Sequence, residues 1–161
     1  MRSAHRPGII VGGGAGAAAA EVAQLATRLA APVVSTANGK GILPEDHAYS
    51  LGAGLHPPST AEFVADCDVV LAVGTELAPS DLWNGPLTFN GELIRIDIDP
   101  VQIVTNALPD ITLVGDAAQT LAALLPLVES RSDPERAYKW RARIATEAEV
   151  EAVRGCPSWA R

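Results

Sequence analysis

Short aliphatic runs alternate along this chain with longer segments whose apolar residues recur every three or four positions. An apolar run of four to six residues that ends at a glycine or a polar turn is typical of a strand buried in a parallel sheet. The runs therefore predict five strands, at residues 7–11, 31–36, 69–74, 92–99 and 111–114. The longer segments predict helices at residues 17–31, 59–65, 117–128 and 135–154.

This alternation of strands and helices predicts an α/β fold. We expect a three-layer, doubly wound, mostly parallel sheet of five to six strands with right-handed crossovers, hence a Rossmann-like domain. We assign residues 1–131 to this domain. A polar hinge at residues 130–134 separates it from the charged helix that follows, and we assign residues 132–161 to a helical linker.

Three glycines, Gly12, Gly13 and Gly14, join the first strand to an alanine-rich helix. Glycines at such a junction let a ligand approach the free amides of a helix start, which suits an anion and most often a nucleotide phosphate. A dinucleotide site also needs an acid about 20 residues further on, but the second strand ends at Ser35 and Thr36. An NAD-binding unit and a structural turn that binds no ligand are the alternatives.

Two further loops follow strands and carry polar residues. Lys40 lies in a glycine-rich loop after the second strand. It is expected to be either a phosphate ligand or a solvated loop residue. Glu76 and Asp81 follow the central strand, where open sheets place their ligand crevice, and we favour loop surface over a functional acidic pair. We expect at most one of Asp97 and Asp99 to face a ligand and the other to cap residues 101–104.

Composition limits the partners of the chain. Its 161 residues carry a net charge of −7, which argues against nucleic acid and against an anionic membrane. Cys67 and Cys156 fit no metal spacing, and the three histidines have no nucleophile partner or metal spacing. No apolar run is long enough to span a membrane, and no signal peptide is recognisable. We expect a reduced, cytoplasmic chain.

The predicted linker helix has a thin apolar stripe formed by Trp140, Ile144 and Ala148. Such a helix usually docks on a neighbour. A helix that leads to another domain is expected to project from the body. A helix that belongs to a free-standing module is expected to fold back on it.

Several segments occur in one order that resembles the central domain of thiamine-diphosphate-dependent enzymes of the acetolactate synthase and 2-oxo acid decarboxylase type. The segments are the apolar strand with its three glycines at residues 9–15, the lysine loop at residues 35–47, the strand end at residues 73–77, the Ile-Asp-Ile-Asp-Pro strand end at residues 96–100, and Gly115-Asp116.

The resemblance implies a Rossmann-like fold of the DHS-like NAD/FAD-binding type. It also implies a parent enzyme, a transferase or lyase, that decarboxylates a 2-oxo acid with thiamine diphosphate and Mg²⁺ and in which the resulting carbanion can pass to an acceptor. Both cofactors would be held by N- and C-terminal domains of the same polypeptide, outside this chain. The chain alone is therefore not expected to be catalytic, and the parent is expected to be a homo-oligomer.

In some members of that family the central domain holds FAD. Carried over to this sequence, the flavin site would consist of Gly12, Gly13, Gly14, Thr36, Lys40, Gly41, Asp97, Asp99 and Asp116. Flavin-binding relatives commonly have an arginine followed by an aromatic residue where this chain has Glu76 and Leu77. We therefore expect a scaffold domain without flavin, closer to decarboxylases of 2-oxo acids with a cationic side chain. The alternatives are an FAD-binding acetolactate synthase domain and a free-standing nucleotide-binding or assembly module.

Overall fold

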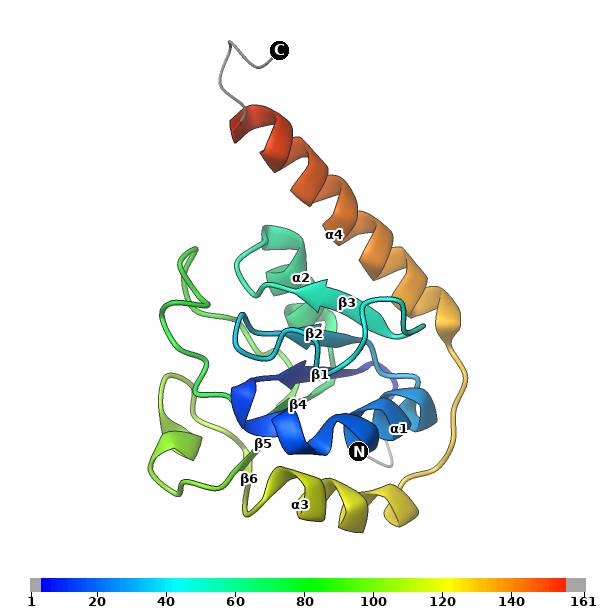
Figure 1. Ribbon diagram of the computed structural model, residues 1–161, viewed down its shortest axis with the longest axis vertical. Coiled ribbons are helices and arrows are strands. Elements are labelled where there is room, and N and C mark those ends of the chain that lie inside the picture. Colours follow the sequence, from blue (N-terminus) through cyan, green and yellow to red (C-terminus); the bar gives the residue numbers. More distant parts are fainter. Residues whose placement is uncertain (1–3, 156–161) are drawn as a thin grey trace.

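Six parallel strands form one sheet in the order β3-β2-β1-β4-β5-β6 in the computed structural model, which describes residues 4–155 (Figure 1). The strands are β1 (Pro7–Val11), β2 (Val33–Ser35), β3 (Ser50–Ala53), β4 (Val69–Val73), β5 (Glu92–Asp97) and β6 (Ile111–Val114). The predicted doubly wound fold is confirmed, and so are its five predicted strands. The strand order changes direction between β1 and β4, which is where such sheets open a crevice.

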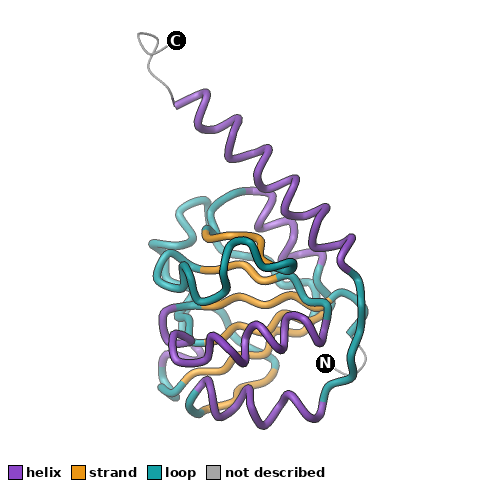
Figure 2. Tube along the Cα trace, turned by 45° about the vertical axis from the view of Figure 1, so that its right-hand side comes forward, coloured by secondary structure: helices purple, strands orange, loops and turns teal. Residues whose placement is uncertain are grey.

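Helices cover both faces of this sheet (Figure 2). One face carries α1 (Ala19–Leu29) and α3 (Ala117–Leu124), and the other carries α2 (Pro58–Asp66). Two of the predicted helices are partly 3₁₀: η1 (Gly13–Ala18) precedes α1, and η3 (Leu125–Leu127) follows α3. Pro126 lies in η3, where its missing amide donor explains why the α-helix does not continue.

The middle strands are buried on both sides. In β1, Ile9 and Val11 pack with α1, whereas Ile10 packs with the residues of α2. All five residues of β4 are also buried. Because every residue of these strands is covered, their sequences are continuous apolar runs rather than alternating patterns.

Arg95 of β5 is 1% exposed and is the only fully buried charged residue in the described part of the chain. Its guanidinium donates hydrogen bonds to the carbonyl oxygens of Thr75, Gln102, Thr105 and Ala107. Burial lowers the pKa of Arg95 below its ordinary value, and the nearby carboxylates of Asp97 and Glu76 oppose this shift. Arg95 therefore ties residues 102–107, which contain the short turn η2 (Gln102–Val104), to the end of β4.

The long helix α4 (Pro134–Gly155) lies against the α2 face as far as about Glu147, and its end extends beyond the body (Figure 1). Ala137 is fully buried, and Trp140 packs edge-to-face on Phe63 of α2 with ring centroids 5.7 Å apart. Ile144 also packs on this face, whereas Ala148 is exposed. The helix is thus folded back on the body along part of its length and projects along the rest. It does not decide between a linker to another domain and a free-standing module.

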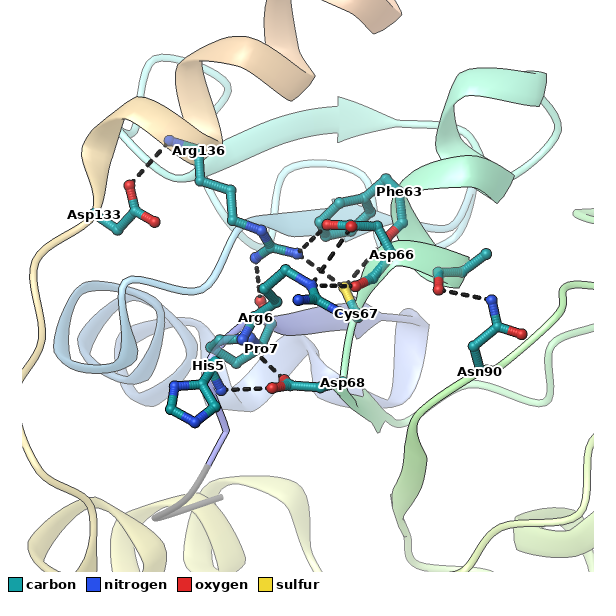
Figure 3. Close-up of polar contacts among 11 residues, drawn as sticks. His5, Arg6, Pro7, Phe63, Asp66, Cys67, Asp68, Asn90, Asp133 and Arg136 are labelled. Atoms are coloured by element: carbon teal, nitrogen blue, oxygen red, sulfur yellow. Dashed lines mark hydrogen bonds and ion pairs between the residues drawn. The ribbon is translucent and has the colours of Figure 1, made fainter.

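Arg136 attaches the start of α4 to the body (Figure 3). Its guanidinium donates to the carbonyl oxygen of Pro7 at 2.7 Å and lies 3.4 Å from a carboxylate oxygen of Asp66. It also donates to the sulfur of Cys67 at 3.3 Å. Burial raises the pKa of the Cys67 thiol to about 11, although Arg136 lowers it, so the thiol is neutral at physiological pH. Cys67 is a buried, free thiol.

Further polar contacts continue along α4. A carboxylate oxygen of Glu147 accepts a hydrogen bond from the amide of Ser59 at 2.8 Å, so a residue of α4 caps the start of α2. Glu62 of α2 does not cap its own helix and pairs instead with Arg143. Arg141 donates to the carbonyl oxygens of His47, Ala48 and Ser50, beside β3. Side chains of α4 therefore cap the first turn of α2 and bind the carbonyl groups beside the edge strand β3.

We expect Arg95→Met to destabilise the protein by about 3 kcal/mol, because four carbonyl groups, one buried and three half-buried, lose a charged donor. Urea unfolding followed by far-UV circular dichroism measures this change. The exposed Arg28→Met is the matched control and should change the unfolding free energy by less than about 0.5 kcal/mol. Equal effects of the two substitutions would show that the carbonyl cluster does not depend on Arg95.

Ala137→Asp should release α4 from the body, because it places a carboxylate in a fully buried position. Limited trypsin digestion should then cut the basic residues between 131 and 143 at least about tenfold faster than in the parent chain. Ala142→Asp, on the exposed side of the same helix, should leave the rate unchanged. If both variants are cut at the parent rate, packing at Ala137 does not hold the helix.

Candidate functional site

A cleft of about 200 Å³ opens at the carboxyl ends of β1, β2 and β4, where the strand order reverses. It is lined by Gly12, Gly13, Gly14, Thr36, Asn38, Gly74, Thr75, Glu76, Ala78 and Asp81. The cleft is smaller than the roughly 300–1,000 Å³ typical of small-molecule sites. It lies where the sequence predicts a nucleotide crevice.

The glycines of this cleft bring backbones into contact. A Cβ atom on Gly12 would lie 2.4 Å from the carbonyl oxygen of Gly74, which no side chain can occupy. The amide of Gly12 donates to the carbonyl of Val73, and the amide of Gly14 donates to that of Gly74. Gly13 is the only one of the three glycines whose amide has no acceptor within the described residues. Most donors of the predicted phosphate loop are therefore already used.

The loop after β2 closes the cleft from a second side. The hydroxyl of Thr36 accepts a hydrogen bond from the amide of Gly39 at 3.1 Å. A Cβ atom on Gly39 would lie 2.3 Å from the carbonyl oxygen of Val11, so this loop also packs directly on the end of β1. A carboxylate oxygen of Asp81 accepts the amide of Ala37 at 3.1 Å and joins this loop to the one after β4.

The charges at the cleft are negative. Glu76 is exposed on its rim, Asp81 is half-buried, and no Lys, Arg or His side chain of the described residues lines it. The position of Glu76 is fixed through its backbone, because the side-chain amide of Asn106 donates to its carbonyl oxygen at 2.9 Å. An anion in this cleft would meet two carboxylates, whereas phosphate sites usually supply cationic donors.

The structure brings together only four of the nine residues that the sequence assigns to a flavin site, namely Gly12, Gly13, Gly14 and Thr36. Lys40 is 69% exposed and lies 3.8 Å from Glu45, so the cleft lacks the predicted cation. Gly41, next to it, is exposed and outside the lining.

The three aspartates of the predicted site stabilise local turns. Asp99 accepts the amides of Val101 and Gln102, which confirms that one acid of the pair caps this turn. Asp97 accepts the amide of Asp99, and Asp116 accepts the amide of Gln119 at the start of α3. None of the three aspartates lines the cleft.

Sequence reasoning missed two contributors to the site. Asn38 lines the cleft, although its position in a loop full of turn residues marked it only as a turn. Arg95 holds the rim of the cleft by donating a hydrogen bond to the carbonyl oxygen of Thr75. The sequence signal for this role is a single charged residue between Ile94 and Ile96 in an otherwise apolar strand. Trp140, on the predicted apolar stripe of the linker helix, packs on Phe63 of the same chain.

Metal and membrane features are limited. Among the side chains that the structure describes, no three of His, Cys, Asp or Glu gather in a way that could hold a metal ion. Asp116, at the Gly-Asp pair, is used as a helix cap. No helix of the described chain has the length and apolar character needed to cross a membrane.

Comparison with known proteins assigns a family. The family model described as the thiamine pyrophosphate enzyme central domain matches residues 1–124. A probable 2-ketoarginine decarboxylase of Pseudomonas aeruginosa is 47% identical over 159 residues, covering 95% of this chain and 28% of that protein. A probable acetolactate synthase large subunit of Methanocaldococcus jannaschii is 40% identical over 132 residues, covering 78% of this chain and 22% of that protein.

A solved structure has the same fold. It is described as a putative thiamin diphosphate-dependent enzyme of Mycobacterium smegmatis and matches 82% of this chain and 26% of its own, with a TM-score of 0.68 and 24% sequence identity. The chain thus spans about a quarter of the length of the proteins that it matches. From the family match and these relatives, we conclude that the chain belongs to the central-domain family of thiamine-pyrophosphate-dependent enzymes.

Proposed function

We propose that this central domain serves as a scaffold, without bound flavin, in a thiamine-diphosphate-dependent 2-oxo acid decarboxylase. The observation that carries the proposal is the state of the glycine loop. The amides of Gly12 and Gly14 already donate to neighbouring carbonyl groups, which leaves Gly13 as the single free donor among them. A dinucleotide needs several such amides for its pyrophosphate.

The charge of the cleft supports the same conclusion. Glu76 and Asp81 line it, and no cation of the described residues does. A pyrophosphate would therefore be repelled where an arginine would hold it by charge-assisted hydrogen bonds. FAD does not fit these residues. The alternative is an FAD-binding acetolactate synthase domain. It is supported by the 40% identity to the probable acetolactate synthase large subunit of Methanocaldococcus jannaschii.

For the parent enzyme we propose a 2-oxo acid substrate with a cationic side chain. This proposal rests on the 47% identity to the probable 2-ketoarginine decarboxylase, which extends over 95% of the chain. The thiazolium of thiamine diphosphate supplies an electron sink for loss of carbon dioxide. No group of three His, Cys, Asp or Glu side chains in the described part could hold Mg²⁺. In this proposal other domains of the parent bind both cofactors.

Residues 1–131 would then form the central domain, and residues 132–161 a linker towards a C-terminal domain. The end of α4 extends beyond the body, which is the geometry that a linker needs. A homo-oligomeric parent belongs to the same proposal. So does a cytoplasmic location, which agrees with Cys67 being a free thiol.

The purified chain should bind neither FAD nor ADP at concentrations up to about 0.5 mM, because Gly13 has the only free amide among the three glycines and the cleft is lined by no cation. Titration calorimetry at low salt, with flavin fluorescence recorded in parallel, measures the binding. Micromolar affinity that is lost in Gly13→Val would contradict the scaffold proposal and favour the flavin-binding alternative.

Replacing the rim carboxylate should partly restore anion binding. We expect Glu76→Arg to raise the affinity for ADP at least about tenfold, since it exchanges repulsion for a charge-assisted contact. Glu92→Arg changes the net charge equally but lies at the amino end of β5, away from the cleft. If both variants gain the same affinity, the effect comes from overall charge and the carboxylate at Glu76 is not a local barrier.

A further inference from the structure

The strand β6 forms one edge of the sheet and pairs only with β5. It lies at the opposite end of the sheet from β3, whose edge is next to α4 (Figures 1 and 2). The outer backbone groups of β6 therefore have no strand partner within the described chain. An open edge of this kind is a template for another strand.

The surroundings of β6 are apolar. Ten large hydrophobic side chains are exposed in the described chain, and seven of them belong to residues 98–127. In β6 itself, Ile111 is 40% exposed and Val114 is 55% exposed, on opposite faces of the sheet. A pocket of about 300 Å³ lies beside Ile111, between β6 and α3, and all of its lining residues are Leu, Ile or Val. Exposed apolar groups gathered in this way mark an interaction surface.

The charges around this edge have one sign. Residues 96–130 contain five acidic residues and no Lys or Arg. Asp110 precedes β6 and Asp116 follows it, so a carboxylate stands at each end of the strand. Both are held in place, because Asp110 accepts the amide of Leu93 and Asp116 accepts that of Gln119. Neither forms an ion pair with a cation of the described residues.

We propose that the β6 edge binds an extended polypeptide segment from outside this chain, apolar along its middle and with Lys or Arg at both ends. The segment adds to the sheet as a further strand through the outer backbone groups of β6. Its apolar side chains cover Ile111 and Val114, and its terminal cations meet Asp110 and Asp116. A second copy using the same edge would bring these acids against their own counterparts, which disfavours that occupant. The inference is independent of the flavin question.

Two labelled seven-residue peptides test this chemistry. Both alternate valine and threonine, one with lysine at each end and the other with glutamate at each end. In fluorescence anisotropy with the 161-residue chain at low salt, the lysine-ended peptide should bind at least about tenfold more tightly. Equal binding of the two peptides, or binding of neither, would overturn the proposal.

Substitutions locate the binding site on the chain. Val114→Lys should weaken binding of the lysine-ended peptide at least about tenfold, whereas Tyr138→Lys, at a 71% exposed site on α4, should not. The double variant Asp110→Asn with Asp116→Asn keeps hydrogen-bond acceptors at both positions, and it should abolish the difference between the two peptides. Circular dichroism confirms that each variant is folded.

Sedimentation velocity tests the competing occupant. The chain should remain monomeric at the concentrations used for the peptide titrations. A dimer that dissociates in Val114→Lys but not in Tyr138→Lys would replace the proposed segment with a second copy and overturn the proposal.

Discussion

Three loops at the carboxyl edge of the sheet touch through their backbones, and the form of the cleft depends on that contact. Gly12 lies against Gly74, and Gly39 lies against Val11, at distances that leave no room for a Cβ atom. The same contact uses the amides of Gly12 and Gly14. Glycines that contact neighbouring loops in this way have few amide donors left for a phosphate, although their sequence resembles a nucleotide-binding motif.

Arg95 connects these loops to the segment that follows β5. Its buried guanidinium donates its hydrogen bonds to backbone carbonyl groups, whose dipoles compensate the charge together with the nearby carboxylates of Asp97 and Glu76. Residues 102–107 form only one short 3₁₀ turn and could not hold a position alone. Anchored by Arg95, they bring Asn106 to the carbonyl oxygen of Glu76. The position of Glu76 at the cleft rim therefore depends on the buried guanidinium of Arg95.

The sheet was largely predictable because buried parallel strands leave long apolar runs. The strand β3 was not, since Ser50-Leu51-Gly52-Ala53 is short and interrupted by a glycine. In the site, spacing predicted the glycine cluster and Thr36, because strand ends are visible in the pattern. It did not show that Lys40 faces Glu45 or that Glu147 caps α2 from 88 residues away. Those outcomes depend on packing between distant segments, which local pattern does not contain.

The two edges of the sheet differ in their charged neighbours. On the β3 side, Arg141 and Arg143 of α4 bind the carbonyl groups beside β3 and the carboxylate of Glu62. On the β6 side the acids stand without a cation from the described chain, next to exposed aliphatic residues. Acidic groups at an open edge discourage pairing between identical copies. They do not hinder a partner of opposite charge. The β6 edge therefore disfavours pairing with a second copy of itself and still allows a cationic segment to pair with it.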